Sequence, residues 1–315
     1  MPTVRRALAW LAGVATDSNG RVYSWRREGD PASGYPYPEA SALYLHQLMI
    51  DGDTDLPPSQ IAGSLIADYK SHSGIGKSGK IYAFDAGVAL TALHASGQHQ
   101  AVCEEIANDL ANSLHQRRAS SGWPEDAVPR WSRHFGPHLL KSCARLLRCT
   151  PQYGDIAREC FAELSTAYVD GRFESCGPMQ PTYLHAQMYA LEGLSLWREP
   201  CLEQLSEGLD WVASNQDESG AIRAWHDGAL ASGPLRLDVT CQALRLWSAV
   251  DPDRYRSNRV AARQFIERQQ HSSGGFPYEP SSPDLNSWCT LFAIQAIRWS
   301  RLADSGQPCR IEELT

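Results

Sequence analysis

A glycine turn recurs six times along the 315-residue chain and constrains the fold more than any other feature of the sequence. Each turn pairs a small or polar residue with a glycine, and an aromatic or aliphatic residue follows shortly after. The glycines are Gly20, Gly79, Gly122, Gly171, Gly220 and Gly275, at intervals of 59, 43, 49, 49 and 55 residues. Periods of this size are the signature of folds built from repeated units. The chain therefore reads as six copies of one supersecondary unit.

Each unit contains two helical segments of different character. The segment before the turn has apolar residues three and four positions apart, as in Ile61, Leu65 and Tyr69, which is typical of a helix that buries one face. These half-exposed segments cover 4–15, 59–71, 100–116, 155–169, 201–215 and 253–270. The segment after the turn is apolar nearly all round, which is typical of a buried helix. These buried segments cover 39–50, 85–96, 138–149, 185–197, 238–250 and 287–301.

The alternation of half-exposed and buried helices predicts an all-α fold, an (α/α)6 toroid in which an outer ring of helices surrounds an inner ring. An open superhelical solenoid is the structural alternative. Strand signals are weak and confined to the turns. No linker or composition shift divides the chain, so we expect one domain over residues 1–315.

Composition excludes several classes of protein. The chain has 36 Asp and Glu against 29 Lys and Arg, a net charge of −7 that argues against nucleic acid as a partner. No apolar run approaches the ~20 residues of a membrane span, and residues 5–15 are expected to form a structural helix rather than a signal peptide. The nine cysteines show no metal-ligand spacing and read as buried free thiols of a cytoplasmic protein. We expect no metal and no cofactor.

The candidate catalytic positions lie at the starts of the six buried helices, because in a toroid these helices direct their N-termini at one end of the central cavity. They are Glu39, Asp85, His138, His185, Asp238 and Trp288. Helix capping alone would explain Asp85 and Asp238. It explains His138 and His185 poorly, since histidine is not a preferred cap. Two histidines facing one cavity would suit proton transfer near neutral pH.

The surrounding residues predict a site for a sugar. Flat aromatic rings stack on pyranose C–H faces, while polar groups bind the hydroxyls. The expected aromatic wall consists of Tyr37, Tyr183, Trp225 and Trp288, and Asn286 is placed with these binding residues. Basic side chains could hold a substrate carboxylate or phosphate, and the candidates are Arg130, Arg133, Lys141 and Arg236.

With the repeats placed, the chain resembles the six-hairpin toroid superfamily. Segments 37–39 (YPE), 84–87 (FDAG), 181–185 (PTYLH) and 238–242 (DVTCQ) look like those of squalene-cyclase-like proteins associated with bacterial polysaccharide pathways. The superfamily also holds terpene cyclases, prenyltransferase β-subunits, sugar 2-epimerases, glycoside hydrolases and polysaccharide lyases.

The departures from these relatives are specific. The DxDD acid of class II terpene cyclases is absent from the helix starts, and no third ligand joins Asp238 and Cys241 in a prenyltransferase-like zinc set. The sugar 2-epimerases are similar in placing paired histidines on inner helices, which His138 and His185 match by repeat position.

These observations predict a carbohydrate-active enzyme with metal-free acid–base chemistry, foremost a sugar or uronic-acid epimerase or isomerase acting on a small-molecule or oligosaccharide substrate. His138 and His185 would transfer protons, and Glu39, Asp85 and Asp238 would orient them or bind hydroxyls. A glycoside hydrolase or polysaccharide lyase is the nearest alternative, with the same carboxyl groups as acid and base. A terpene-cyclase-like enzyme and a non-catalytic glycan-binding scaffold also remain open.

Overall fold

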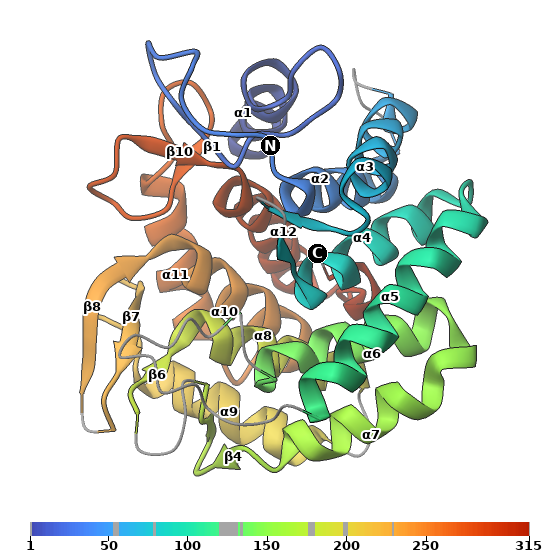
Figure 1. Ribbon diagram of the computed structural model, residues 1–315. Helices are drawn as coiled ribbons and strands as arrows, with labels where there is room; N and C mark the ends of the chain where they lie inside the picture. Colours follow the sequence, from blue (N-terminus) through green and yellow to red (C-terminus); the bar gives the residue numbers. More distant parts are fainter. Residues whose placement is uncertain are drawn as a thin grey trace.

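The computed structural model describes residues 2–52, 57–77, 80–119, 132, 135–175, 180–197, 201–228 and 230–314. Within them the helices lie in two concentric rings (Figure 1). The inner ring consists of α2 (Pro38–Asp51), α4 (Ala83–Ser96), α6 (Leu140–Cys149), α8 (Leu184–Trp197), α10 (Leu237–Val250) and α12 (Ser287–Asp304). The outer ring consists of α1 (Pro2–Trp10), α3 (Pro58–His72), α5 (Gln100–Ala119), α7 (Gly154–Ser165), α9 (Leu202–Ser214) and α11 (Arg256–Arg268).

The inner ring is closed. Each inner helix packs against the next one along the chain, and α12 returns to pack against α2 and α1. The predicted (α/α)6 toroid is therefore confirmed, and the open solenoid is wrong because its last unit would not contact its first. Helix ends agree with the sequence pattern to within a few residues. The exception is the segment 155–169, where α7 ends at Ser165 and the following residues form a short strand instead.

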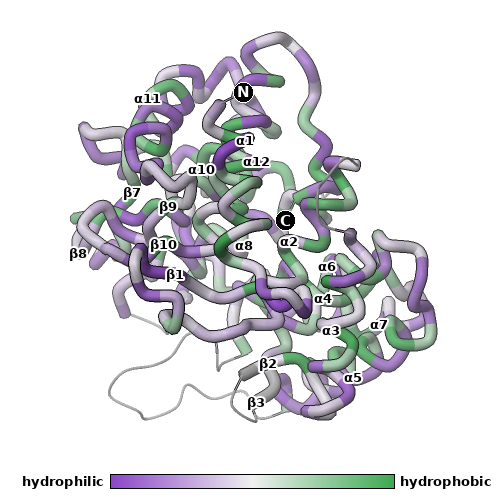
Figure 2. Tube along the Cα trace, turned by 90° about the horizontal axis from the view of Figure 1, so that it is seen from above, coloured by the Kyte–Doolittle hydropathy of each residue, from purple (hydrophilic) through white to green (hydrophobic). Residues whose placement is uncertain are grey.

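Burial follows the two classes of helix seen in the sequence. On α10, twelve consecutive residues from Leu237 to Ser248 are buried. On α11 only Arg259, Ala262, Phe265 and Ile266 are buried, and Figure 2 shows hydrophilic and hydrophobic positions alternating along this helix. Apolar burial drives folding roughly in proportion to the area removed from water. The inner ring and the inward faces of the outer helices therefore form the core.

The recurring glycines mark contacts between consecutive units. Gly220 has φ +92°, and a Cβ at this position would lie 2.3 Å from the carbonyl oxygen of Ala261 on α11. Gly274 has φ +109°, and its Cβ would lie 2.3 Å from the carbonyl oxygen of Arg6 on α1. Only glycine tolerates both the backbone conformation and the close approach. The contact from Gly274 joins the last unit to the first, and its neighbour Gly275 is the residue that the repeat pattern selected.

Short antiparallel strands occupy the connections, as the sequence predicts. One sheet has the order β1 (Trp25–Arg27), β10 (Asp284–Asn286), β9 (Phe276–Pro277), and another has the order β6 (Thr182–Tyr183), β7 (Ile222–His226), β8 (Ala231–Arg236). Two-strand ribbons are formed by β2 (Gly76–Lys77) with β3 (Lys80–Ile81), and by β4 (Tyr168–Val169) with β5 (Arg172–Phe173). Trp25 pairs with Asn286, so this sheet also links the first unit to the last.

Two further predictions concern the state of the cysteines and the possibility of a membrane-spanning helix. Eight of the cysteines fall in the described ranges, and all eight are free thiols. Across those same ranges, no helix has both the length and the apolar character needed to cross a membrane.

Candidate active site

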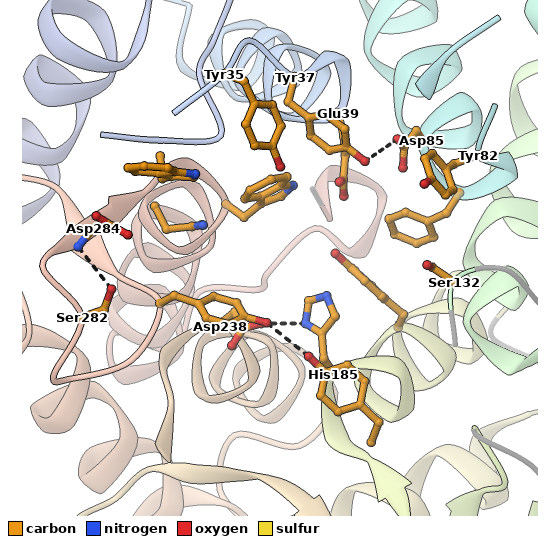
Figure 3. Close-up of a pocket in the computed structure, with 17 residues that line it drawn as sticks. Tyr35, Tyr37, Glu39, Tyr82, Asp85, Ser132, His185, Asp238, Ser282 and Asp284 are labelled. Atoms are coloured by element: carbon orange, nitrogen blue, oxygen red, sulfur yellow. Dashed lines mark hydrogen bonds and ion pairs between the residues drawn. The ribbon is translucent and has the colours of Figure 1, made fainter. Parts of the chain in front are cut away.

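A cavity of about 520 Å³ opens at the end of the ring where the inner helices begin (Figure 3). Five of the six predicted helix-start positions line it: Glu39, Asp85, His185, Asp238 and Trp288. The remaining lining residues are Trp25, Tyr35, Tyr37, Tyr82, Phe84, Ser132, Tyr183, Tyr189, Tyr278, Ser282, Asp284 and Asn286. The inner helices thus converge on one cavity and bring three carboxyl groups and one histidine into it.

His138, the sixth position, does not line the cavity. It is fully buried in a 3-10 turn, η3 (Pro137–Leu139), that precedes α6 and packs against α8. A 3-10 turn advances side chains by a different angle from an α-helix, so the first residue of this unit points in a different direction from its counterparts. The predicted pair of histidines in one cavity is therefore not found.

Asp238 and His185 form one half of the site. Asp238 is fully buried, and Arg236 donates to it from Nε at 3.0 Å and from Nη2 at 2.8 Å. Nδ1 of His185 lies 2.9 Å from the same carboxylate. Burial alone would raise the pKa of Asp238, but the charge of Arg236 and a hydrogen bond from His185 outweigh it and hold that pKa below its ordinary value. Asp238 is thus ionised, and Figure 3 shows the second ring nitrogen of His185 directed into the cavity.

Arg236 is held in place by its own neighbours and does not line the cavity. Its guanidinium lies 3.4 Å from the ring centre of Tyr278 and 5.7 Å from that of Tyr183. The hydroxyls of these two tyrosines are 3.2 Å apart. Arg236 therefore neutralises Asp238, which corrects its predicted role as a substrate ligand. A basic residue two positions from an acid on an extended segment leading into a helix is the only trace of this pairing in the sequence.

Glu39 and Asp85 form the other half of the site. Burial raises the pKa of Glu39 to about 7, although a hydrogen bond from the Trp288 side chain and the charges of Lys141 and Arg145 act to lower it. Burial and then the charge of Glu39 raise the pKa of Asp85 well above its ordinary value. The hydroxyl of Tyr37 donates to Asp85 Oδ2 at 2.7 Å. This half of the site can hold a proton at neutral pH.

The other predicted binding residues divide between the cavity wall and the interior. Tyr37, Tyr183 and Trp288 line the cavity, and so does Asn286, whose Oδ1 accepts from the backbone N–H of Cys289 at 3.0 Å. Trp225 lies behind Tyr183, with ring centres 4.6 Å apart, and does not line the cavity.

Lys141 is buried in the interior and donates to Glu192 at 2.6 Å, so it is not a substrate ligand. Glu192 lies 51 residues further along the chain, on the next inner helix, and no local motif marks the pair. Arg130 and Arg133 fall outside the described residues.

Sequence reasoning missed several lining residues. Tyr189 packs against His185 with ring centres 4.4 Å apart, and its position four residues further on the same helix was an available signal. Tyr278 and Asp284 come from the connection between α11 and α12, where Asp284 begins β10 and the sequence has no helical periodicity. No group of three or more His, Cys, Asp or Glu side chains that could hold a metal ion occurs among the described residues.

Comparisons with known proteins identify the fold. No family model matches the chain, and no curated protein matches it. A solved structure of a possible member of the GH105 family from Klebsiella pneumoniae matches with a TM-score of 0.62 at 13% identity, covering 96% of this chain and 93% of that one.

Two further solved structures are similar over nearly the whole chain. The GH76A α-1,6-mannanase from Salegentibacter gives a TM-score of 0.63 at 13% identity, covering 96% of this chain and 99% of that one. A Clostridium perfringens α-amylase gives a TM-score of 0.67 at 11% identity, covering 95% of this chain and 97% of that one. These likenesses confirm the toroid, while the narrower resemblance to squalene-cyclase-like proteins and sugar 2-epimerases stays a prediction.

Proposed function

We propose that this chain is a carbohydrate-active enzyme that hydrolyses glycosidic bonds. The observation that carries the proposal is the electrostatic contrast across one cavity. Glu39 and Asp85 hold a proton near neutral pH, whereas Asp238 is kept ionised beside His185. Groups with pKa values pushed apart in this way are the usual acid and base of an active site. Glycoside hydrolysis, the nearest alternative in the sequence analysis, therefore replaces the epimerase or isomerase as the main proposal.

The substrate class rests on the aromatic walls and on the fold. Tyr37, Tyr183, Tyr189 and Trp288 give the cavity several flat apolar surfaces beside carboxyl and amide groups. Such surfaces stack on sugar rings while polar groups bind hydroxyls. The similar toroids from Salegentibacter and Clostridium perfringens are a mannanase and an amylase, which supports a glycan as substrate by analogy.

Glu39 is the proposed general acid. A proton donor works best when its pKa lies near the working pH, and the pKa of Glu39 is about 7. Protonating the glycosidic oxygen lets the bond to the anomeric carbon break and leaves Glu39 as a carboxylate. The hydrogen bond from Trp288 then stabilises that carboxylate, and Asp85 with Tyr37 shapes its surroundings.

His185 is the proposed general base. Asp238 fixes the ring through Nδ1, so the second nitrogen can accept a proton from a water molecule that attacks the anomeric carbon. Asp238 stabilises the imidazolium that forms. One proton leaves Glu39 for the leaving group and one enters His185 from water, and exchange with solvent restores both groups.

Proton abstraction from a sugar carbon is the second candidate, because the Asp238–His185 pair also suits that step. It would give an epimerase or a lyase. The loss of His138 from the cavity counts against the two-histidine epimerase of the sequence analysis, since no second histidine lines the cavity among the described residues.

A screen of neutral and acidic oligosaccharides, read as new reducing ends, tests the proposal. We expect the wild-type protein to cleave at least one glycan and Glu39→Gln to lose that activity on unactivated linkages. Arg256→Gln, an exposed change on α11, is the matched control and should keep full activity. An oligosaccharide cleaved equally by Glu39→Gln and wild type would overturn the assignment of the acid.

A further inference from the structure

A second cavity, of about 180 Å³, lies at the opposite end of the ring from the candidate active site. It is enclosed where inner helices end rather than where they begin, by residues near the C-termini of α2, α4, α6 and α8. The segment after α12, which includes the 3-10 turn η5 (Ile311–Glu313), covers it. The lining residues are His46, Thr91, His94, Ala95, Arg145, Arg148, Cys149, Leu196, Glu312 and Leu314. Nothing in the proposed reaction uses this cavity.

Arg145 is the unusual residue of the second cavity. Its side chain is 3% exposed, and Nη2 makes one long hydrogen bond, 3.4 Å, to the carbonyl oxygen of Leu314. Its Nε and Nη1 atoms are buried without a hydrogen-bond partner among the described residues. Burying a charged donor without an acceptor is costly, and proteins rarely leave such groups unsatisfied. Among the described residues, the charge of Arg145 is therefore met by no strong acceptor.

The carboxylate whose charge acts most strongly on Arg145 already has two partners. Glu192 accepts from Lys141 through Oε2 at 2.6 Å and from Arg245 through Oε1 at 2.5 Å. Burial lowers the pKa of Arg145 only to about 10, so this side chain carries a full charge at neutral pH. Arg145 has no ion pair among the described residues, and the carboxyl groups of Glu192 and Glu39 act on it only through their charges. The charge balance of the interior thus favours an added anion beside Arg145.

The other groups of the cavity suit a small anion. Arg148 lies one helical turn beyond Arg145 and lines the same space. His46 is buried, and burial together with the charge of Arg145 lowers its pKa to about 3, so it is neutral. Glu312 is the one acidic side chain among the lining residues. The carbonyl ends of the helices offset part of the positive charge, but they give no acceptor to Nε or Nη1 of Arg145.

We propose that this second cavity binds a small oxyanion, which forms ion pairs with the guanidinium groups of Arg145 and Arg148. A planar guanidinium edge matches two oxygens of a phosphate, sulfate or carboxylate group. The cavity volume limits the ligand to a group of about that size. The site would be separate from the catalytic cavity and would serve binding rather than turnover.

Calorimetric titration of the full chain with inorganic phosphate, at constant ionic strength set with chloride, tests this inference. Sulfate and acetate are the second and third probes, and they separate a tetrahedral from a planar ligand. We expect one saturable site for at least one probe. Arg148→Gln should weaken it by about tenfold or more, since a charge-assisted pair is lost. Arg158→Gln, an exposed change on α7 outside the cavity, should leave the affinity unchanged.

Arg145→Met gives a second readout. It should abolish binding of the probe, and in chloride alone its unfolding midpoint should equal or exceed that of the wild type, because an unsatisfied buried charge is removed. Should Arg145→Met fail to fold, Arg148→Gln alone decides the question. The inference is overturned if no probe gives more heat than chloride, or if Arg148→Gln binds as tightly as wild type.

Discussion

The Oδ2 atom of Asp238 lies 2.9 Å from Nδ1 of His185, so a carboxylate on α10 fixes the ring of a histidine on α8. Other residues support this pair. Asp238 is ionised because Arg236 faces it, and Arg236 is in turn held against Tyr278. Three units of the repeat therefore cooperate to orient one imidazole toward the cavity.

Asp238→Asn should lower kcat by about 100-fold or more while changing KM little, because an amide no longer stabilises the imidazolium. The steady-state kinetics of the glycan identified by the screen measure this split. Asp217→Asn is the matched control, since Asp217 also pairs with an arginine but lies in a turn away from the cavity. Equal kcat values for Asp238→Asn and wild type would show that His185 does not act as the base.

The activity should fall on the alkaline side of neutrality. Glu39 donates only in its protonated form, and its pKa is about 7, so kcat/KM should decline as the pH rises through about 7. A pH–rate profile from pH 5 to pH 9 measures this limb, in steps of about half a unit.

Trp288→Phe should move the alkaline decline of kcat/KM to higher pH. The indole hydrogen bond lowers the pKa of Glu39, so removing it lets the pKa rise. Trp225→Phe, which changes a tryptophan behind the cavity wall, is the control and should leave the limb in place. If the alkaline decline of kcat/KM shifts equally in both variants, or in neither, the assignment of Glu39 as the acid is contradicted.

Glu39 should also make stability depend on pH. Its folded pKa of about 7 lies above the usual value, so the folded state binds more protons than the unfolded chain between about pH 4.5 and pH 7. Stability therefore falls as the pH rises through this window, by about 3 kcal/mol from this residue alone. Urea unfolding at several pH values measures it. The decline should be smaller in Glu39→Gln, and an identical decline in the two proteins would be inconsistent with a raised pKa.

The repeat glycines should be sensitive to substitution for a steric reason. Gly220→Ala introduces a Cβ 2.3 Å from the Ala261 carbonyl, whereas Gly228→Ala, at nearly the same φ of +95°, meets nothing within 4 Å. Both changes carry the cost of a left-handed backbone, about 1 kcal/mol. Overpacking should lower the free energy of unfolding of Gly220→Ala by roughly 1–3 kcal/mol more than that of Gly228→Ala. Denaturant unfolding of the two variants compares them, and equal losses would remove the proposed contact between units.

The fold was largely predictable because two simple signals coincide in every unit. Hydrophobic periodicity separates α11, buried at four positions, from α10, buried at twelve in succession. The glycine spacing then counts the units. Ring closure was only inferred from this count, since the contacts between Gly274 and Arg6 and between Trp25 and Asn286 join residues far apart in the sequence.

The sequence predicts a site residue well where its position in the repeat determines that it lines the cavity. It predicts less well where a partner distant in sequence determines what the side chain does. Glu39, Asp85, His185, Asp238 and Trp288 occupy equivalent helix starts and line one cavity. His138 occupies the same place in the pattern, but a 3-10 turn redirects it. Lys141 and Arg236 looked available for a substrate because Glu192 and Asp238, which neutralise them, are recognised as partners only in three dimensions.

Hydrolysis in a mixture of ¹⁸O-labelled water and D₂O, analysed by mass spectrometry and proton NMR, tests the central claim most directly. The account predicts one ¹⁸O atom at the new anomeric centre and no deuterium at any ring carbon, and it predicts that Glu39→Gln gives no ¹⁸O-labelled product. An unsaturated product without ¹⁸O, or deuterium at a ring carbon without cleavage, would contradict a hydrolase and point to proton abstraction by His185.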